Sequence, residues 1–167
     1  GDLVDGVADV EHRQRELGHQ ALQPGQHLGL ARGVQGGQGS QAQVTDSIIS
    51  GGTIGASVTA ESTLNLVNTS LTATNPDGIG LLSFAGTVHA QGGSITGAKG
   101  ISIRRISAGD EGTLVLDGTQ VTGQSGSAIE LLNSTTATID ILNGTTLSGG
   151  NGTIIDVLDG STATVNV

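Results

Sequence analysis

The charged residues of the chain decide first what chemistry it could perform. Cleavage of a polysaccharide calls for clustered carboxylates and a Lys or Arg that acts as the base. From residue 45 onward the basic residues are only Lys99, Arg104 and Arg105, and the Asp and Glu residues are scattered. His89 has no Ser or Asp at a spacing that would make it a general base. We therefore expect no catalytic residue and no cofactor, and we interpret Arg104 and Arg105 as a solvated surface pair.

Two carboxylates recur at equivalent places in the sequence. Glu130 and Asp156 lie 26 residues apart, each between two apolar residues. This spacing predicts that they lie one above the other on an outward ladder, where like charges cost roughly a few tenths of a kcal/mol. The plain interpretation is a tolerated surface pair. The sharper hypothesis is a weak contact with a divalent cation or a cationic partner, and no other metal site is expected.

Composition and charge exclude several classes of partner. The formal net charge is −9 at pH 7, and nucleic acid or an anionic membrane would require basic patches instead. No apolar run approaches ~18 residues, so we expect no membrane insertion by this segment. Cys is absent, which excludes disulfides and thiolate metal sites. The one aromatic residue is Phe84, so any core must be thin and filled by aliphatic side chains.

A short pattern recurs through the second part of the chain. A Thr followed by alternating apolar residues returns after 24, 26, 25 and 26 residues. The copies are Thr63-Leu-Asn-Leu, Thr87-Val-His-Ala, Thr113-Leu-Val-Leu, Thr138-Ile-Asp-Ile and Thr164-Val-Asn-Val. Two further strand signals follow within each repeat, separated by Gly, Asn, Asp and Ser, which favour sharp corners. A repeat of this length indicates a solenoid.

The predicted fold is all-β, a right-handed parallel β-helix with three faces and about 24–26 residues per turn, over residues 45–167. Equivalent residues should lie on parallel strands about 4.8 Å apart, so Leu114 is expected beside Ile139. The expected inward columns are Leu64, Val88, Leu114, Ile139 and Val165; Leu66, Ala90, Leu116, Ile141 and Val167; Leu71, Ile95, Val121 and Leu147; and Ile79, Ile101, Ile129 and Ile155, with Leu81, Ile103, Leu131 and Val157 beside them. The last strand is left uncovered, so we expect further turns in the native protein, and self-association of this piece through the open edge.

Residues 1–44 differ in composition from the rest. Residues 1–43 contain no Thr, Ile, Asn or Lys, and they are rich in Gln. We interpret 1–44 as a low-order N-terminal arm that packs little against the solenoid, or as a leader that is not native to it. Limited proteolysis should remove this arm and leave a stable remainder.

The repeats from about Thr63 to Val167 resemble bacterial autotransporter passenger domains of the pertactin-like β-helix family. The motifs that carry the resemblance are Gly118-Thr-Gln-Val-Thr-Gly, Gly144-Thr-Thr-Leu-Ser-Gly-Gly-Asn-Gly-Thr and Gly160-Ser-Thr-Ala-Thr-Val. The resemblance implies a fragment of a passenger displayed on the bacterial cell surface through a C-terminal β-barrel that is not in this chain. It further implies adhesion to a host or cell-surface receptor. The competing hypothesis is a fragment of a β-helical polysaccharide lyase or hydrolase.

Overall fold

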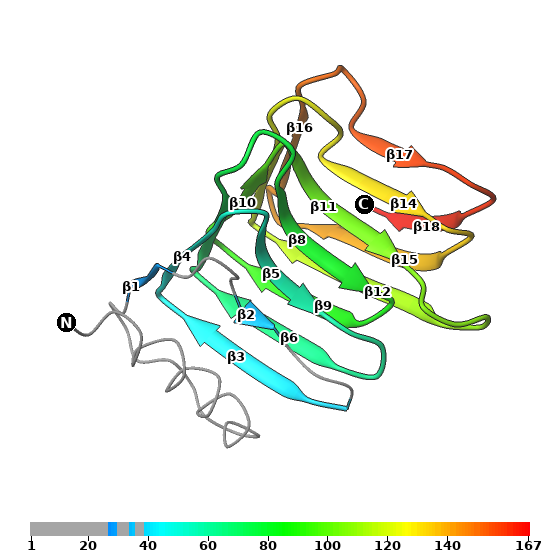
Figure 1. Ribbon diagram of the computed structural model, residues 1–167, viewed down its shortest axis with the longest axis horizontal. Coiled ribbons are helices and arrows are strands. Elements are labelled where there is room, and N and C mark those ends of the chain that lie inside the picture. The colour runs from blue at the N-terminus through cyan, green and yellow to red at the C-terminus, as the bar shows by residue number, and fades with distance from the viewer. Residues whose placement is uncertain (1–26, 30–33, 36–38) are drawn as a thin grey trace.

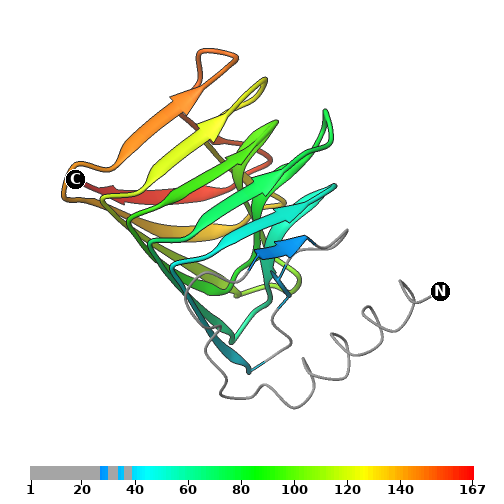
Figure 2. The ribbon, with the colours of Figure 1, turned by 90° about the vertical axis from the view of Figure 1, so that its left-hand side faces the viewer.

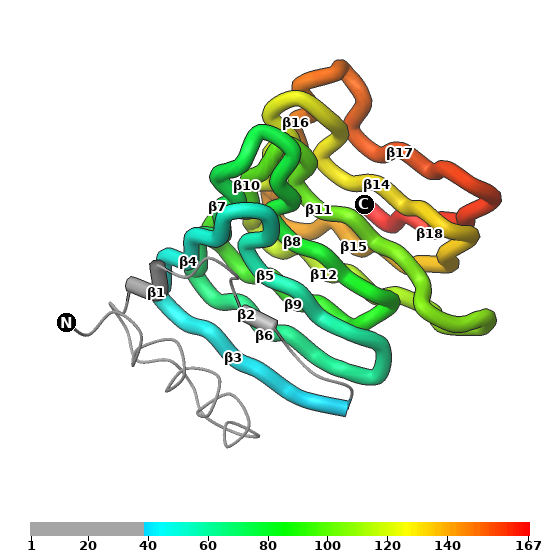
Figure 3. Tube along the Cα trace, viewed as in Figure 1, coloured from blue at the N-terminus to red at the C-terminus, as the bar shows by residue number. Residues whose placement is uncertain are grey.

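The protein is a β-solenoid built from three parallel sheets, which confirms the predicted all-β fold of stacked parallel strands (Figures 1 and 2). The computed structural model describes residues 27–29, 34–35 and 39–167, and these ranges contain strands and no helix. Each turn contributes one strand to each sheet, and Figure 3 shows the chain winding from one end of the stack to the other.

Each sheet contains six strands. Sheet A consists of β3 (Gln41–Thr45), β6 (Thr63–Val67), β9 (Thr87–Gln91), β12 (Glu111–Asp117), β15 (Thr136–Leu142) and β18 (Thr162–Asn166). Sheet B consists of β1 (His27–Gly29), β4 (Ile48–Gly51), β7 (Ser70–Ala73), β10 (Ser94–Gly97), β13 (Gln120–Gly123) and β16 (Thr146–Gly149). Sheet C consists of β2 (Val34–Gln35), β5 (Ile54–Val58), β8 (Ile79–Phe84), β11 (Lys99–Arg104), β14 (Ile129–Leu132) and β17 (Ile155–Val157).

The register of sheets A and B is the predicted one. Leu114 pairs with Val88 on one side and with Ile139 on the other. In sheet B, Ile95 pairs with Leu71 and with Val121. These side chains fill the space between the three sheets, since each of them is at most 1% exposed. Burial of aliphatic columns is worth about 1.5–3 kcal/mol per side chain, and this is the main force that holds successive turns together.

The predicted register is wrong at one place in sheet C. Ile101 pairs with Leu81 in the preceding turn, whereas Ile79, the predicted neighbour, pairs with Lys99. The cause is the corner between sheets B and C, which spans residues 74–78 before β8 but only residue 98 before β11. The number of residues between successive strands therefore depends on the length of the corner. The pairing of the strands instead depends on which residues face the core. The later pairs, Ile101 with Ile129 and Ile129 with Ile155, are as predicted.

The solenoid begins earlier than the predicted boundary at residue 45. Strand β3 starts at Gln41 and pairs with β6, and its Val44 is 2% exposed in the core. The short strands β1 and β2 pair in parallel with β4 and β5. Ala42 and Val44 supply the two inward positions that a strand of sheet A needs. The Gln-rich composition around them had instead suggested a low-order arm. Residues 1–26, 30–33 and 36–38 of the predicted arm lie outside the described ranges, so its removal by proteolysis stays a prediction.

A left-handed residue forms the corner after each strand of sheet A from β3 to β15. Their φ angles lie between 47° and 66°. The residues are Asp46, Asn68, Gly92, Gly118 and Asn143. Gly, Asn and Asp tolerate this conformation better than other residues. In the first four, the backbone N–H donates to a carbonyl oxygen of the next turn. Asn68 and Asn143 also donate a side-chain hydrogen bond to an Asp of the preceding turn, over 3.2 and 2.7 Å.

Burial along one column predicts a gradient of stability effects. Leu71 and Leu147 occupy the same column of sheet B, but Leu71 is fully buried and Leu147 is only partly buried. Leu71→Ala is expected to lower the free energy of unfolding by about 2–5 kcal/mol, because the shortened side chain leaves a cavity that the surrounding core closes only in part. Leu147→Ala should cost less than half as much. Urea unfolding followed by circular dichroism checks both, and equal losses would contradict the observed burial.

Candidate functional site

The outer faces of the three sheets differ in chemistry. The outer face of sheet A carries a row of Thr in register, namely Thr63, Thr87, Thr113, Thr138 and Thr164. The strands of sheet B from β4 to β16 contain no charged residue. By contrast, Lys99 and Arg104 lie on β11 in sheet C, and Arg105 follows directly. All the Lys and Arg residues of the described ranges therefore lie on strand β11 of sheet C or directly after it.

A buried carboxylate, Glu130, lies at the centre of this charged face. Its side chain is 3% exposed although it points away from the core. The Lys99 Nζ atom lies 2.7 Å from Oε2 and 3.0 Å from Oε1 of Glu130. Ser102 Oγ donates to Oε1 over 2.8 Å, and Arg104 Nη2 lies 3.8 Å from the same oxygen. Arg104 Nε donates to Ser102 Oγ over 3.1 Å, so four side chains form one connected network.

The structure brings Glu130 and Asp156 together, as the repeat predicted, because they are partners in the ladder between β14 and β17. It corrects the expectation of an exposed pair. Lys99, Ser102 and Arg104 cover Glu130, and a buried carboxylate requires such partners. The cationic contact proposed for Glu130 is therefore made within the chain. Arg104 is likewise no solvated partner of Arg105, since it binds Ser102 and faces Glu130.

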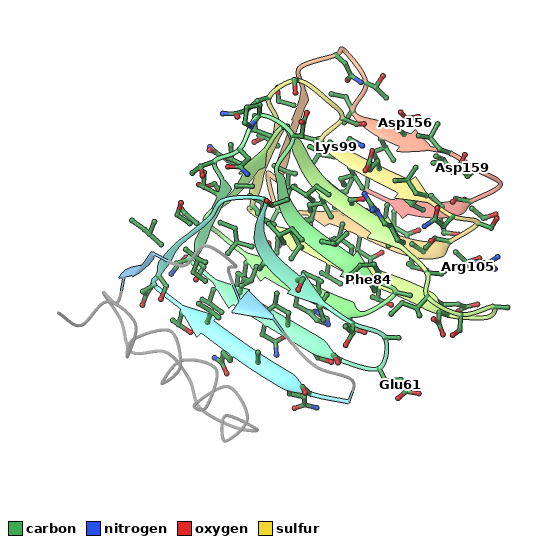
Figure 4. The ribbon with its side chains drawn as sticks, viewed as in Figure 1. Glu61, Phe84, Lys99, Arg105, Asp156 and Asp159 are labelled. Atoms are coloured by element: carbon green, nitrogen blue, oxygen red, sulfur yellow. The ribbon has the colours of Figure 1, made fainter. Side chains whose placement is uncertain are left out.

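This network has limited means for acid–base chemistry. Lys99 and Arg104 are 41% and 30% exposed at their side chains, but both are directed to the carboxylate that they neutralise. No group of three or more His, Asp or Glu side chains that could hold a metal ion occurs in residues 39–167. Figure 4 labels Lys99 on β11 and Asp156 on β17, the strands on the two sides of β14. The arrangement is well suited to tying β11 to β14, because Lys99 and Arg104 of β11 neutralise the buried carboxylate of Glu130 on β14.

Phe84 and His89 are placed by their strands. Phe84 ends β8, is half-buried, and is the ladder partner of Arg104 (Figure 4). The left-handed residue Ala85 follows it, so Phe84 lies at the corner where β8 ends. His89 is exposed on the outer face of β9, as its position between Val88 and Ala90 predicted.

A depression on sheet A is a feature that the sequence analysis missed. It measures about 330 Å³ and is lined by Gln43, Asn65, Leu66, Val67, His89 and Gln91. These residues come from β3, β6 and β9, which are 22 to 24 residues apart along the chain. The sequence signal that could have identified them is the set of outward-facing residues on these strands, because it contains amide side chains and an imidazole in successive turns.

Comparisons of the chain with known proteins returned no match. No family model, no curated protein and no solved structure is similar to it. In the ranges that the structure describes, no helix is long and apolar enough to cross a membrane.

Proposed function

We propose that the chain is a structural and adhesive, non-catalytic segment of a surface-displayed β-solenoid, a passenger of an autotransporter-like protein. In this proposal the whole protein lies at the bacterial cell surface, held by a barrel outside this chain, and contacts a host or cell-surface receptor. Three regular sheets give a rod whose outer faces are long and repetitive. Solenoids use such extended surfaces for binding, and the Gly-Thr-rich corner motifs support the passenger assignment.

The observation that supports a non-catalytic role is the burial of the Glu130 carboxylate and its hydrogen bonding within the chain. Glu130 is the one acidic residue that is buried in residues 39–167, and Lys99, Ser102 and Arg104 occupy its oxygens. A general acid or base must reach the substrate, whereas this carboxylate is covered on its outer side. The network therefore supports a role in holding two strands together.

A display experiment tests the proposal. The chain is placed between a secretory signal and a translocator barrel in a Gram-negative host, and cells that carry the barrel alone serve as control. We expect the solenoid to become accessible to added protease and the cells to bind more strongly to cultured epithelial cells. A chain that stays inside the cell, or displayed chains that do not raise binding, would contradict the proposal.

The alternative, a β-helical polysaccharide lyase or hydrolase, is favoured by one observation. Lys99, Arg104, Glu130 and Asp156 meet on sheet C, and this is the combination of bases and acids that such chemistry requires. Incubation with polygalacturonate, alginate and neutral glucans, followed by reducing-end analysis, separates the two functions. No cleavage is expected. Cleavage that disappears in Glu130→Gln would support the enzyme instead.

Self-association through the last strands is a further prediction. Strand β18 has a partner only in β15, and its Val165 is 40% exposed. An unpaired strand edge with apolar side chains recruits other chains, so the chain as given should sediment as oligomers whose size grows with concentration. Val165→Lys is expected to shift it towards monomer. Val115→Lys, on the outer face of the central strand β12, is the matched control and should leave association unchanged; a monomeric starting chain would contradict the prediction.

A further inference from the structure

The depression on sheet A has a floor from one strand and walls from two others. Asn65 and Val67 lie on β6 and are half-buried, whereas Gln43, His89 and Gln91 on β3 and β9 are exposed. Gln43, Asn65 and His89 are successive ladder partners, and Val67 pairs with Gln91. The hollow thus arises because Asn65 lies between the longer Gln43 and His89, and Val67 lies beside the longer Gln91.

The polar atoms around this hollow are free to bind a ligand. Among the described residues, the side chains of Gln43, Asn65, His89 and Gln91 make no hydrogen bond to one another or to any neighbour. Elsewhere on the solenoid comparable amides are paired, as Asn68 is with Asp46 and Asn143 is with Asp117. Three amides and an imidazole therefore border one open space, and their hydrogen-bond donors and acceptors remain available to a ligand.

The chemistry of the lining selects the kind of ligand. An amide offers donors and an acceptor in one group, and so does a neutral imidazole, which matches a hydroxyl group that both donates and accepts. No Asp, Glu, Lys or Arg lines the hollow, so nothing in it attracts a charged ligand. The Val67 side chain in the floor offers an apolar contact, which suits the C–H face of a sugar ring.

We propose that this depression binds a neutral saccharide, with Asn65 and His89 as the main hydrogen-bonding residues. The row Gln43, Asn65 and His89 extends over two strand spacings, about 9.6 Å, which gives room for a short oligosaccharide along the solenoid axis. The row ends at Val115, the ladder partner of His89, which cannot hydrogen-bond through its side chain. The inference rests on the proposed adhesive function, for which it names a ligand class.

The test is a titration of the isolated, isotope-labelled chain followed by nuclear magnetic resonance. The probes are cellotriose, maltotriose and N,N′,N″-triacetylchitotriose, with trigalacturonate as the charged counterpart, each up to on the order of 10 mM. At least one neutral trisaccharide is expected to shift the His89 imidazole signal, which is assigned by its loss in His89→Gln. Asn65→Ala and His89→Ala are each expected to weaken binding roughly three- to tenfold, the range for one lost hydrogen bond. Thr96→Ala, on the outer face of sheet B, is the control and should leave the affinity unchanged.

Each other outcome overturns the inference. Absence of binding by all three neutral sugars would do so, and so would binding that survives both Asn65→Ala and His89→Ala. A preference for trigalacturonate would also overturn it and would direct attention to Lys99 on β11 and Arg105 directly after that strand. Cell binding in the display experiment is a separate readout, so a failed titration with intact cell adhesion would remove the sugar site and leave the proposed function standing.

Discussion

Gly93→Ala is expected to lower the free energy of unfolding by about 3 kcal/mol or more. Gly93 follows the corner after sheet A with φ +73°, where a side chain costs about 1–2 kcal/mol. A Cβ atom there would also lie 2.2 Å from the Thr69 carbonyl oxygen and 2.6 Å from the Thr69 nitrogen. Both are backbone atoms of the neighbouring turn, so the two turns must move apart, which adds about 1–3 kcal/mol. Chemical denaturation of the purified variant measures the loss.

Gly118, the counterpart of Gly92 in the next turn, provides a control glycine with a similar backbone conformation. Its φ is +60°, but a Cβ atom there would meet only the Asn143 carbonyl oxygen, at an ordinary 3.5 Å. Gly118→Ala should therefore cost only the backbone term of about 1–2 kcal/mol. Gly118→Asn should cost still less, because Asn68 and Asn143 already occupy the equivalent corner of other turns. Equal effects of Ala at positions 93 and 118 would show that contact between turns does not limit this corner.

The double variant Lys99→Met with Arg104→Met is expected to destabilise the protein by about 3 kcal/mol. It removes both cations from a carboxylate that is 3% exposed, and leaves Ser102 as its one remaining partner in the network. Loss of the partner of a buried charge costs about 3–5 kcal/mol. We take the low end because the Lys99 side chain is 41% exposed, so water partly screens this pair. Thermal and urea unfolding should agree on the direction.

Glu130→Gln should cost far less than the double variant, within about 1 kcal/mol. The amide oxygen can still accept from Ser102, and Lys99 can turn into water because it is already partly exposed. Arg105→Met, which removes a cation outside the network, is the control and should be neutral within about 0.5 kcal/mol. Adding Glu130→Gln to the double variant should restore most of the lost stability, since no buried charge remains. Absence of this rescue would show that Lys99 and Arg104 act through packing of their stems.

The sequence by itself determined the architecture. The repeat of about 25 residues, with apolar residues at alternate positions in each strand, predicts parallel stacking of successive turns around a thin aliphatic core. The reason is that the same set of residues must face inward in every turn. Leu114 beside Ile139 and Ile95 beside Val121 follow directly. Asn, Asp and Gly at the corners follow from their tolerance of a left-handed backbone.

Three features of the molecule were decided only by the tertiary structure. The partner of Ile101 depended on the length of the corner before it, which strand spacing does not reveal. The burial of Glu130 depended on Lys99, 31 residues earlier, since a side chain outside the core is covered only by neighbours from other turns. The depression arose where Asn65 lies between the longer Gln43 and His89 of the two adjacent turns, next to Val67. Periodicity identifies which residues share a face, but the length, charge and partners of their neighbours determine what that face can bind.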